Sequence, residues 1–166
     1  LAGTADSAEE ALSDAKLSAE HRCVVDQMVS DLRGLTVETR VSPNPQVRRA
    51  GRMVHLETEV CGELNEGASL LDLVAALHPT PALGGAPRSK ALEWLRSTEP
   101  LHRGYYGAPI GWISPSGDGV CLVAIRSALL STGCVHGFAG AGIVAGSIPE
   151  AEWIETELKF DAISTR

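Results

Sequence analysis

The sequence predicts an α+β fold, in which long helices are combined with a run of antiparallel strands. Three observations support this class. Apolar residues recur at helical spacing near the N-terminus, alternating apolar segments separated by turn residues fill positions 105–139, and a second amphipathic segment follows position 149. With 166 residues, of which 44% are apolar, the chain can form one globular domain with its own core.

The first helix is predicted over residues 7–32. Ser7 and Glu10 have the spacing of a capping box at its start. Its apolar stripe has the three- and four-residue spacing of a helix and consists of Leu17, Val24, Met28 and Leu32.

The middle of the chain predicts short elements. Residues 35–41 alternate like a half-buried strand, and residues 42–45 form a turn. Val54, Leu56 and Val60 also alternate, so His55 would point to the opposite face. A short helix over 70–77 ends at His78-Pro-Thr-Pro81, because proline cannot continue a helix.

The second half predicts a helix, a strand meander and a final helix. Pro87 fits the first turn of a helix that reaches about Arg96. Strands are expected over 105–113, 120–129 and 134–139, with a turn at 115–119 and a glycine-rich loop at 140–146. The final helix begins near Pro149, with Ser147 and Glu150 at capping-box spacing.

Charge and composition exclude several function classes. The net charge of −7 argues against a nucleic-acid partner, and no apolar run reaches membrane-spanning length. Four cysteines without CxxC spacing are interpreted as reduced thiols, and no signal peptide is visible, so a cytoplasmic location is expected. Because residue 1 is Leu rather than Met, we expect that upstream sequence is missing.

The final helix carries two carboxylates and an amine on one face. Glu152, Glu155 and Lys159 are three and four residues apart. This pattern is typical of a solvated face with a Glu–Lys pair. It also suits a hard divalent cation, which prefers oxygen ligands. Spacing alone leaves both interpretations open.

Glu20 lies on the apolar stripe of the first helix, three residues after Leu17. A carboxylate there should be paired, protonated or bound to a metal, unless it sits at the edge of the stripe and reaches water.

Arg126 lies in an apolar segment predicted to be a strand, where a guanidinium can bind a carboxylate bidentately or form a structural ion pair. The loop 140–146 lacks the GxGxxG spacing of a dinucleotide site; its backbone could approach an anion or simply form a tight turn. His55 and His78 could be ligands or bases, but they have no partner at metal-ligand spacing.

Seven blocks of the sequence are informative together: Leu1-Ala-Gly-Thr4, Lys16 with Glu20-His21, residues 77–85, residues 103–107, Ala124-Ile-Arg126, residues 138–144 and residues 150–159. In these blocks and their order, the sequence resembles the C-terminal half of the chorismate-binding family, which includes isochorismate, anthranilate, aminodeoxychorismate and salicylate synthases. The Arg-Pro-Arg-Gly-like continuation that is usual in the family after Thr4 is absent. The resemblance implies an α/β sandwich with antiparallel sheets and outer helices, of which residues 1–166 are the C-terminal part.

The resemblance also implies roles for individual residues. Glu20, Glu152 and Glu155 match the residues that hold Mg²⁺, which would clamp the ring carboxylate of chorismate. Arg126, the Gly140 backbone and Lys159 match groups that receive the enolpyruvyl carboxylate. Pocket-wall positions are matched by Tyr106, Ala82, Leu83, Ile125, Phe138 and Thr4.

The form His78-Pro-Thr-Pro81 is typical of isochorismate synthases within the family. The implied reaction adds water at C2 of chorismate and removes the C4 hydroxyl. Its general base, a lysine, and its general acid, a glutamate, are expected upstream of residue 1. Salicylate synthase is the second interpretation, and a non-catalytic chorismate- or partner-binding remnant is the third. The intact protein is expected to be a monomer.

Overall fold

A computed structural model describes residues 2–3, 12–50 and 53–164, and it confirms the α+β class. The helices are α2 (Ala15–Leu32), α3 (Leu70–Leu77), α4 (Pro81–Gly84), α5 (Arg88–Thr98) and α6 (Pro149–Ser164). The strands are β1 (Ala2–Gly3), β2 (Thr36–Val41), β3 (Gln46–Ala50), β4 (Met53–Glu57), β5 (Val60–Leu64), β6 (Pro109–Ile113), β7 (Gly119–Val123), β8 (Ser127–Ser131) and β9 (Cys134–Phe138).

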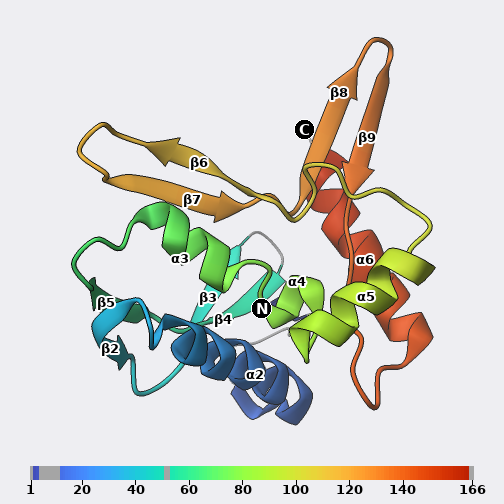
Figure 1. The fold of residues 1–166 in the computed structure, drawn as a ribbon. Coiled ribbons are helices and arrows are strands. Elements are labelled where there is room, and N and C mark those ends of the chain that lie inside the picture. The colour runs from blue at the N-terminus through green and yellow to red at the C-terminus, as the bar shows by residue number, and fades with distance from the viewer. Residues whose placement is uncertain (1, 4–11, 51–52, 165–166) are drawn as a thin grey trace.

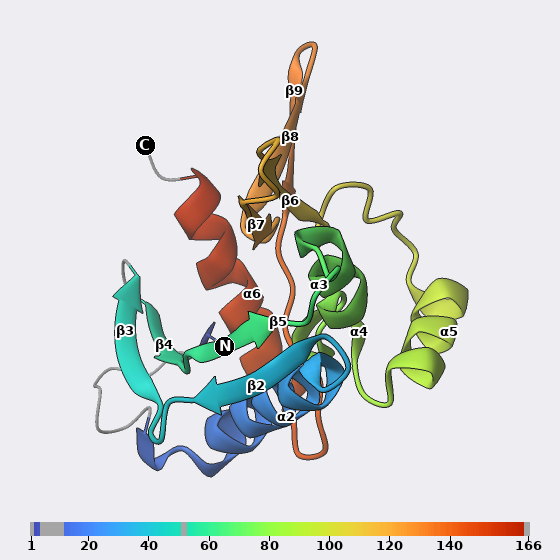
Figure 2. The ribbon, with the colours of Figure 1, turned by 60° about the vertical axis from the view of Figure 1, so that its left-hand side comes forward.

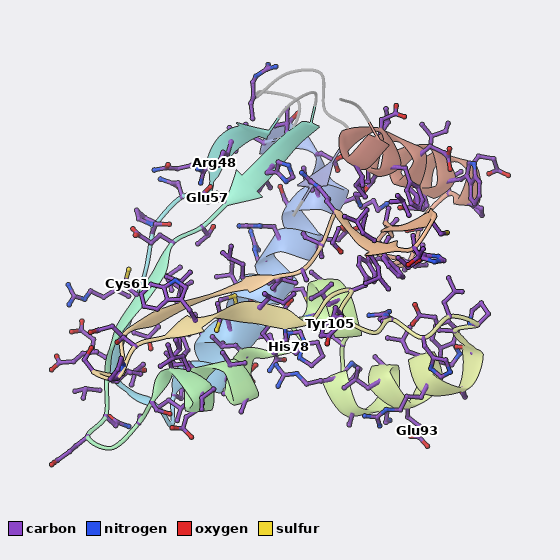
Figure 3. All side chains as sticks on the ribbon, turned by 90° about the horizontal axis from the view of Figure 1, so that it is seen from above. Arg48, Glu57, Cys61, His78, Glu93 and Tyr105 are labelled. Atoms are coloured by element: carbon purple, nitrogen blue, oxygen red, sulfur yellow. The ribbon has the colours of Figure 1, made fainter. Side chains whose placement is uncertain are left out.

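The strands form small antiparallel sheets. The order is β1-β4-β3 in one sheet, and β2-β5, β6-β7 and β8-β9 pair as three two-stranded ribbons. On the first sheet, Nη1 of Arg48 on β3 donates to Glu57 on β4 at 2.9 Å, and the two side chains extend together from the sheet (Figure 3). The pair is exposed and lies away from the site described below.

The first helix begins later than the sequence predicts. Asp14 interrupts helical structure after Leu12 and Ser13, and its carboxylate accepts a hydrogen bond from the backbone N–H of Leu17. Asp14 is therefore the N-cap of α2, since an aspartate there satisfies a backbone donor that has no partner within the helix. The predicted cap at Ser7 lies outside the described residues.

The predicted strand over 120–129 is broken. β7 ends at Val123 and β8 begins at Ser127, because Arg126 has φ = 51° and turns the chain out of the extended conformation. The strand predicted to begin at Tyr105 starts only at Pro109, after a turn. Sequence patterning did not predict β1, β3 or the single turn of α4.

The remaining predictions agree more closely. α3 spans the predicted residues, and α6 begins at Pro149 as expected. α5 begins one residue after Pro87, which acts as its N-cap. Ser147 does not form the predicted capping box with Glu150; its Oγ accepts from the backbone N–H of Val144 at 3.1 Å. All four cysteines are free thiols, and no described helix is long and apolar enough to span a membrane.

The buried core lies where α2 packs against the β1-β4-β3 sheet. Leu17 of α2 contacts the cluster formed by Val54 and Leu56 of β4, with Val47 of β3 packed beside it. Val54 is 1% exposed. This packing fixes the first turns of α2, and therefore Glu20, relative to β4.

The ribbons β6-β7 and β8-β9 form two arms: β6-β7 runs over α3, and β8-β9 extends away from the core (Figure 1). The β8-β9 arm projects beyond the rest of the molecule in the rotated view as well (Figure 2). Both arms carry exposed apolar side chains, which include Ile110, Leu122, Leu130 and Val135. The segments that follow β7 and β9 line a cavity together with α2 and α6.

Candidate functional site

A cavity of about 640 Å³ lies where α2, α4, α5, α6 and the segments after β7 and β9 converge. Charged groups from α2, α6 and the break before β8 face an apolar wall from α4 and the residues around it. Ten residues selected from the sequence line it: Glu20, Ala82, Leu83, Tyr106, Ile125, Arg126, Gly140, Glu152, Glu155 and Lys159.

The three carboxylates reach the cavity from two helices. Glu20 lies one turn after Leu17, so the face of α2 that enters the core also points this carboxylate inward. Glu152 and Glu155 lie three residues apart near the start of α6. The side chain of Glu152 is only 8% exposed, whereas those of Glu20 and Glu155 are 17% and 18% exposed.

Lys16 stands among these carboxylates. Its Nζ donates to Oε1 of Glu152 and lies 3.8 Å from Oε1 of Glu20. The hydrogen bond to Glu152 is the main cause that raises the pKa of Lys16 above its usual value. Burial acts to raise the pKa of Glu152, but the hydrogen bonds from Lys16 and Ser147 outweigh it and leave that pKa below its usual range.

Glu20 differs from its neighbours electrostatically. Burial is the main cause that raises its pKa, and the charges of Glu152 and Glu155 add to the effect, while Lys16 opposes it. Its Oε1 is buried without a hydrogen-bond partner. A buried carboxylate oxygen that lacks a partner is costly unless a cation or proton satisfies it, so this atom suits a hard cation.

The carboxylates do not form a complete ligand set as they stand. Within the described residues, no group of three or more His, Cys, Asp or Glu side chains is close enough to hold a metal ion. Lys16 already occupies part of the space between Glu20 and Glu152. The donor chemistry fits Mg²⁺, while the amine competes with it.

Lys159 and Gly140 form the other side of the cavity. The Lys159 ammonium donates to Oε1 of Glu155 at 2.6 Å and to the carbonyl of Gly140 at 2.8 Å. A Cβ on Gly140 would lie 3.0 Å from Oη of Tyr106, so the glycine allows the tyrosine to lie against the loop. The Tyr106 ring stacks on Phe138 with centroids 5.6 Å apart, and burial raises the pKa of its hydroxyl.

Arg126 enters the cavity from the break between β7 and β8. Its positive φ is uncommon for a residue other than glycine and costs on the order of 1 kcal/mol or more. Such strain is characteristic of functional positions. The guanidinium contacts Nε2 of His55 at 3.0 Å, and burial lowers its pKa without making it neutral.

Some predicted residues lie outside the cavity lining. Phe138 supports Tyr106 from behind, and His55 contacts Arg126. His78 follows α3 as its C-cap, and burial, helped by the charge of Arg88, lowers its pKa. Thr4 lies outside the described residues.

The structure adds residues that the sequence did not single out for a role. The most informative is Lys16, which lies in the first turn of α2, where a positive charge opposes the helix dipole. That conflict could have marked it had the start of the helix been placed correctly. Arg103 also lines the cavity: it donates to both carboxylate oxygens of Glu99 and to the carbonyl of Leu83, which ties α5 to the apolar wall.

A family model described as "Chorismate binding enzyme" matches residues 2–166. The chain is 40% identical to the salicylate biosynthesis isochorismate synthase of Pseudomonas aeruginosa over 98% of its own length, which is 36% of that relative. It therefore spans about a third of the length of this relative.

Solved structures agree with the sequence comparison. A protein assigned as the 2,3-dihydroxybenzoate-specific isochorismate synthase DhbC of Bacillus anthracis superposes with a TM-score of 0.85 at 40% identity, over 94% of this chain and 42% of that one. Anthranilate synthase component I of Streptococcus pneumoniae superposes with a TM-score of 0.86 at 32% identity, over 94% and 36%.

Proposed function

Since the chain belongs to the chorismate-binding enzyme family, we propose that the protein carrying it is an isochorismate synthase that requires Mg²⁺. One observation carries this proposal. The carboxylates of Glu20, Glu152 and Glu155 and the cationic side chains of Arg126 and Lys159 line the same cavity as an apolar wall. Chorismate has a hydrocarbon ring that carries one carboxylate and a hydroxyl, and an enolpyruvyl side chain that carries a second carboxylate, so it needs this combination of groups.

We propose that the enolpyruvyl carboxylate is received by Arg126 and Lys159. The guanidinium offers a planar fork of donors that matches a carboxylate. Lys159 is held between Glu155 and the Gly140 carbonyl, so its ammonium is already oriented and loses little side-chain freedom when a ligand binds. Tyr106, Ala82, Leu83 and Ile125 then exclude water from the ring.

Glu20, Glu152 and Glu155 would hold the metal. When bound, Mg²⁺ supplies positive charge that clamps the ring carboxylate and stabilises negative charge near the reacting carbons. Oε1 of Glu20, which is buried without a hydrogen bond, supports this assignment. The proposed reaction adds water at C2 and removes the C4 hydroxyl. No residue of this chain is assigned as its base or acid; the family's lysine and glutamate would supply these roles.

The choice within the family rests on His78-Pro-Thr-Pro81 and on the isochorismate synthases among the relatives. Anthranilate synthase is also similar in structure, and salicylate synthase shares the first chemical step as we propose it. The three activities differ in their products. Isochorismate forms with water alone, salicylate requires further loss of pyruvate, and anthranilate requires an ammonia source.

The test is turnover of chorismate by the full-length protein that carries this chain, with products separated by chromatography. We expect isochorismate as the product, and no activity after the metal is removed with EDTA until Mg²⁺ is restored. Salicylate or anthranilate as the main product would replace the proposed reaction with the corresponding one. Binding of chorismate without any product would favour the non-catalytic interpretation.

Glu155→Gln tests the metal assignment with almost no change in shape. It should lower kcat/KM by about a hundredfold, because a neutral amide leaves the metal charge unbalanced. Glu157→Gln is the matched control. It lies on the same helix and is exposed, so it should retain wild-type activity. Full activity of the Glu155 variant would refute the role proposed for that carboxylate.

A further inference from the structure

Lys16 is placed by tertiary contacts rather than by local helix preference. It occupies the first turn of α2, where a cation is unfavourable, and it precedes Glu20 by four residues, the weaker orientation for such a pair. Its closest partner is Glu152, which is 136 residues away. A residue that breaks a local rule in a site is a candidate for a functional role.

The charge of the cluster depends on this amine. Glu20, Glu152 and Glu155 contribute three negative charges when ionised, and Lys16 and Lys159 contribute two positive ones. All three carboxylates act on the Lys16 ammonium. With both lysines in place the cluster carries one negative charge, and a divalent cation would make it positive. If Lys16 leaves, the same cation brings the cluster to neutrality.

The two lysines differ in how firmly they are held. Lys159 is 13% exposed and donates to both Glu155 and the Gly140 carbonyl. Lys16 is 40% exposed and its one short contact is with Glu152. Four rotatable bonds allow its ammonium to reach water without movement of α2. Lys16 is therefore the amine that can be exchanged.

We propose that Lys16 holds the place of the divalent cation in the carboxylate cluster, so that metal binding is an exchange in which its ammonium leaves Glu152. This proposal rests on the metal assignment made above. Lys16 is a positioning residue in this scheme: while the metal is absent, it keeps Glu20 and Glu152 from repelling each other, and its departure opens the space between them.

Titration of the metal-free, full-length protein with MgCl₂ by calorimetry, without chorismate, tests the exchange. Lys16→Met removes the charge and keeps a long apolar chain. It should bind Mg²⁺ about fivefold more tightly, since one partly exposed ion pair no longer has to be broken. Lys90→Met is the matched control: Lys90 is exposed on α5, and the same change in net charge there should leave the affinity unchanged.

A measurement on the unmodified protein is independent of whether the variant folds. Acetic anhydride labelling, followed by mass spectrometry, reports how accessible each amine is. Addition of Mg²⁺ should increase labelling of Lys16 severalfold, whereas Lys159 and Lys90 should label at unchanged rates.

The outcomes separate the exchange from the proposed function. If the wild-type protein binds Mg²⁺ and converts chorismate, but Lys16→Met binds the metal no more tightly and Lys16 labelling does not rise, the exchange is wrong and the function stands. Weaker Mg²⁺ binding by the variant would also overturn the exchange, since Lys16 would then support the bound metal. If the wild-type protein neither binds Mg²⁺ nor converts chorismate, both proposals fail.

Discussion

Nη2 of Arg126 lies 3.0 Å from Nε2 of His55, and this contact joins the break after β7 to the central strand β4. Arginine has only donors, so Nε2 of His55 accepts in this hydrogen bond. The imidazole thereby orients a strained, partly buried cation.

Replacing Arg126 separates binding from backbone strain. Arg126→Ala and Arg126→Gly both remove the guanidinium, so both should raise KM for chorismate strongly. Only glycine adopts the positive φ of this position without strain, so the glycine variant should be the more stable by about 1 kcal/mol. Chemical denaturation of the two full-length variants measures the difference. A glycine variant less stable than the alanine variant would contradict the strain assigned to Arg126.

His55 should matter through the acceptor it offers. In His55→Gln the amide oxygen can still accept from Arg126, whereas His55→Leu leaves the guanidinium without this partner. We expect the leucine variant to raise KM about tenfold with a smaller change in kcat, and the glutamine variant to stay close to wild type. Steady-state kinetics of both variants provide the test. Equal losses in both would show that the ring's shape, rather than its acceptor, is what the site requires.

Gly140 and Gly142 form a matched pair in one loop. A Cβ on Gly140 would lie 3.0 Å from Oη of Tyr106, whose ring cannot retreat easily because it stacks on Phe138. A Cβ on Gly142 would lie 3.8 Å from Oε2 of Glu20, an ordinary contact. Gly140→Ala should therefore lower kcat/KM by a factor that corresponds to about 1 kcal/mol or more of activation free energy, and Gly142→Ala should lower it much less. A greater loss for Gly142→Ala would contradict this model of the loop.

His78 should titrate below its ordinary range, because burial and the charge of Arg88 lower its pKa. The unfolded state then takes up a proton before the folded state does. The stability contributed by neutral His78 is present above the unfolded pKa, near 6.5, and is lost as the pH falls below it. An NMR titration of the ring measures the pKa directly, and His78→Gln should reduce the loss of stability between neutral and mildly acidic pH. A ring pKa above 6.5 would disprove this assignment.

The 166-residue chain should self-associate when it is produced alone, because its two arms carry exposed apolar side chains. Leu122 and Leu130 are 69% and 76% exposed on β7 and β8, and exposed apolar ribbons promote association. Light scattering should show aggregation that decreases when both residues are replaced by Thr. Leu71→Thr is the control, because Leu71 is similarly exposed but lies on α3. A chain that stays monomeric and unfolds cooperatively would contradict the expectation.

Elements defined by local signals were predicted well. α3 has the predicted bounds because Ser69 and Asp72 form a capping box at its start and prolines follow its end. The break at Arg126 could not be predicted, because its φ is maintained by contacts such as that with His55, which is remote in sequence. β3 was missed because its sequence has no apolar alternation: Arg49 takes the position two residues after Val47 where a second apolar residue would be expected.

The candidate site was predicted only in part, because some of its residues stand out in the sequence and others are recognised only from the structure around them. Glu20 could be selected because a carboxylate on an apolar stripe is unusual, and the structure places it in the same cavity as Glu152 and Glu155. Lys16 was not given a role, because a helix predicted from residue 7 places it in a helix interior, where lysine is ordinary. Only the cap at Asp14 shows that it lies in the first turn.

The contact between Lys16 and Glu152 can form only late in synthesis of the chain, because its two residues are far apart in sequence. The amine leaves the ribosome 136 residues before its carboxylate partner, a delay of about 10 s at ordinary translation rates. During that interval α2 can dock on β4, but its inward-facing charges have no partners from α6. A polypeptide released before α6 would therefore have the apolar wall without Glu152, Glu155 and Lys159, so it would lack two of the carboxylates proposed to hold the metal and one of the two cations proposed to receive a carboxylate.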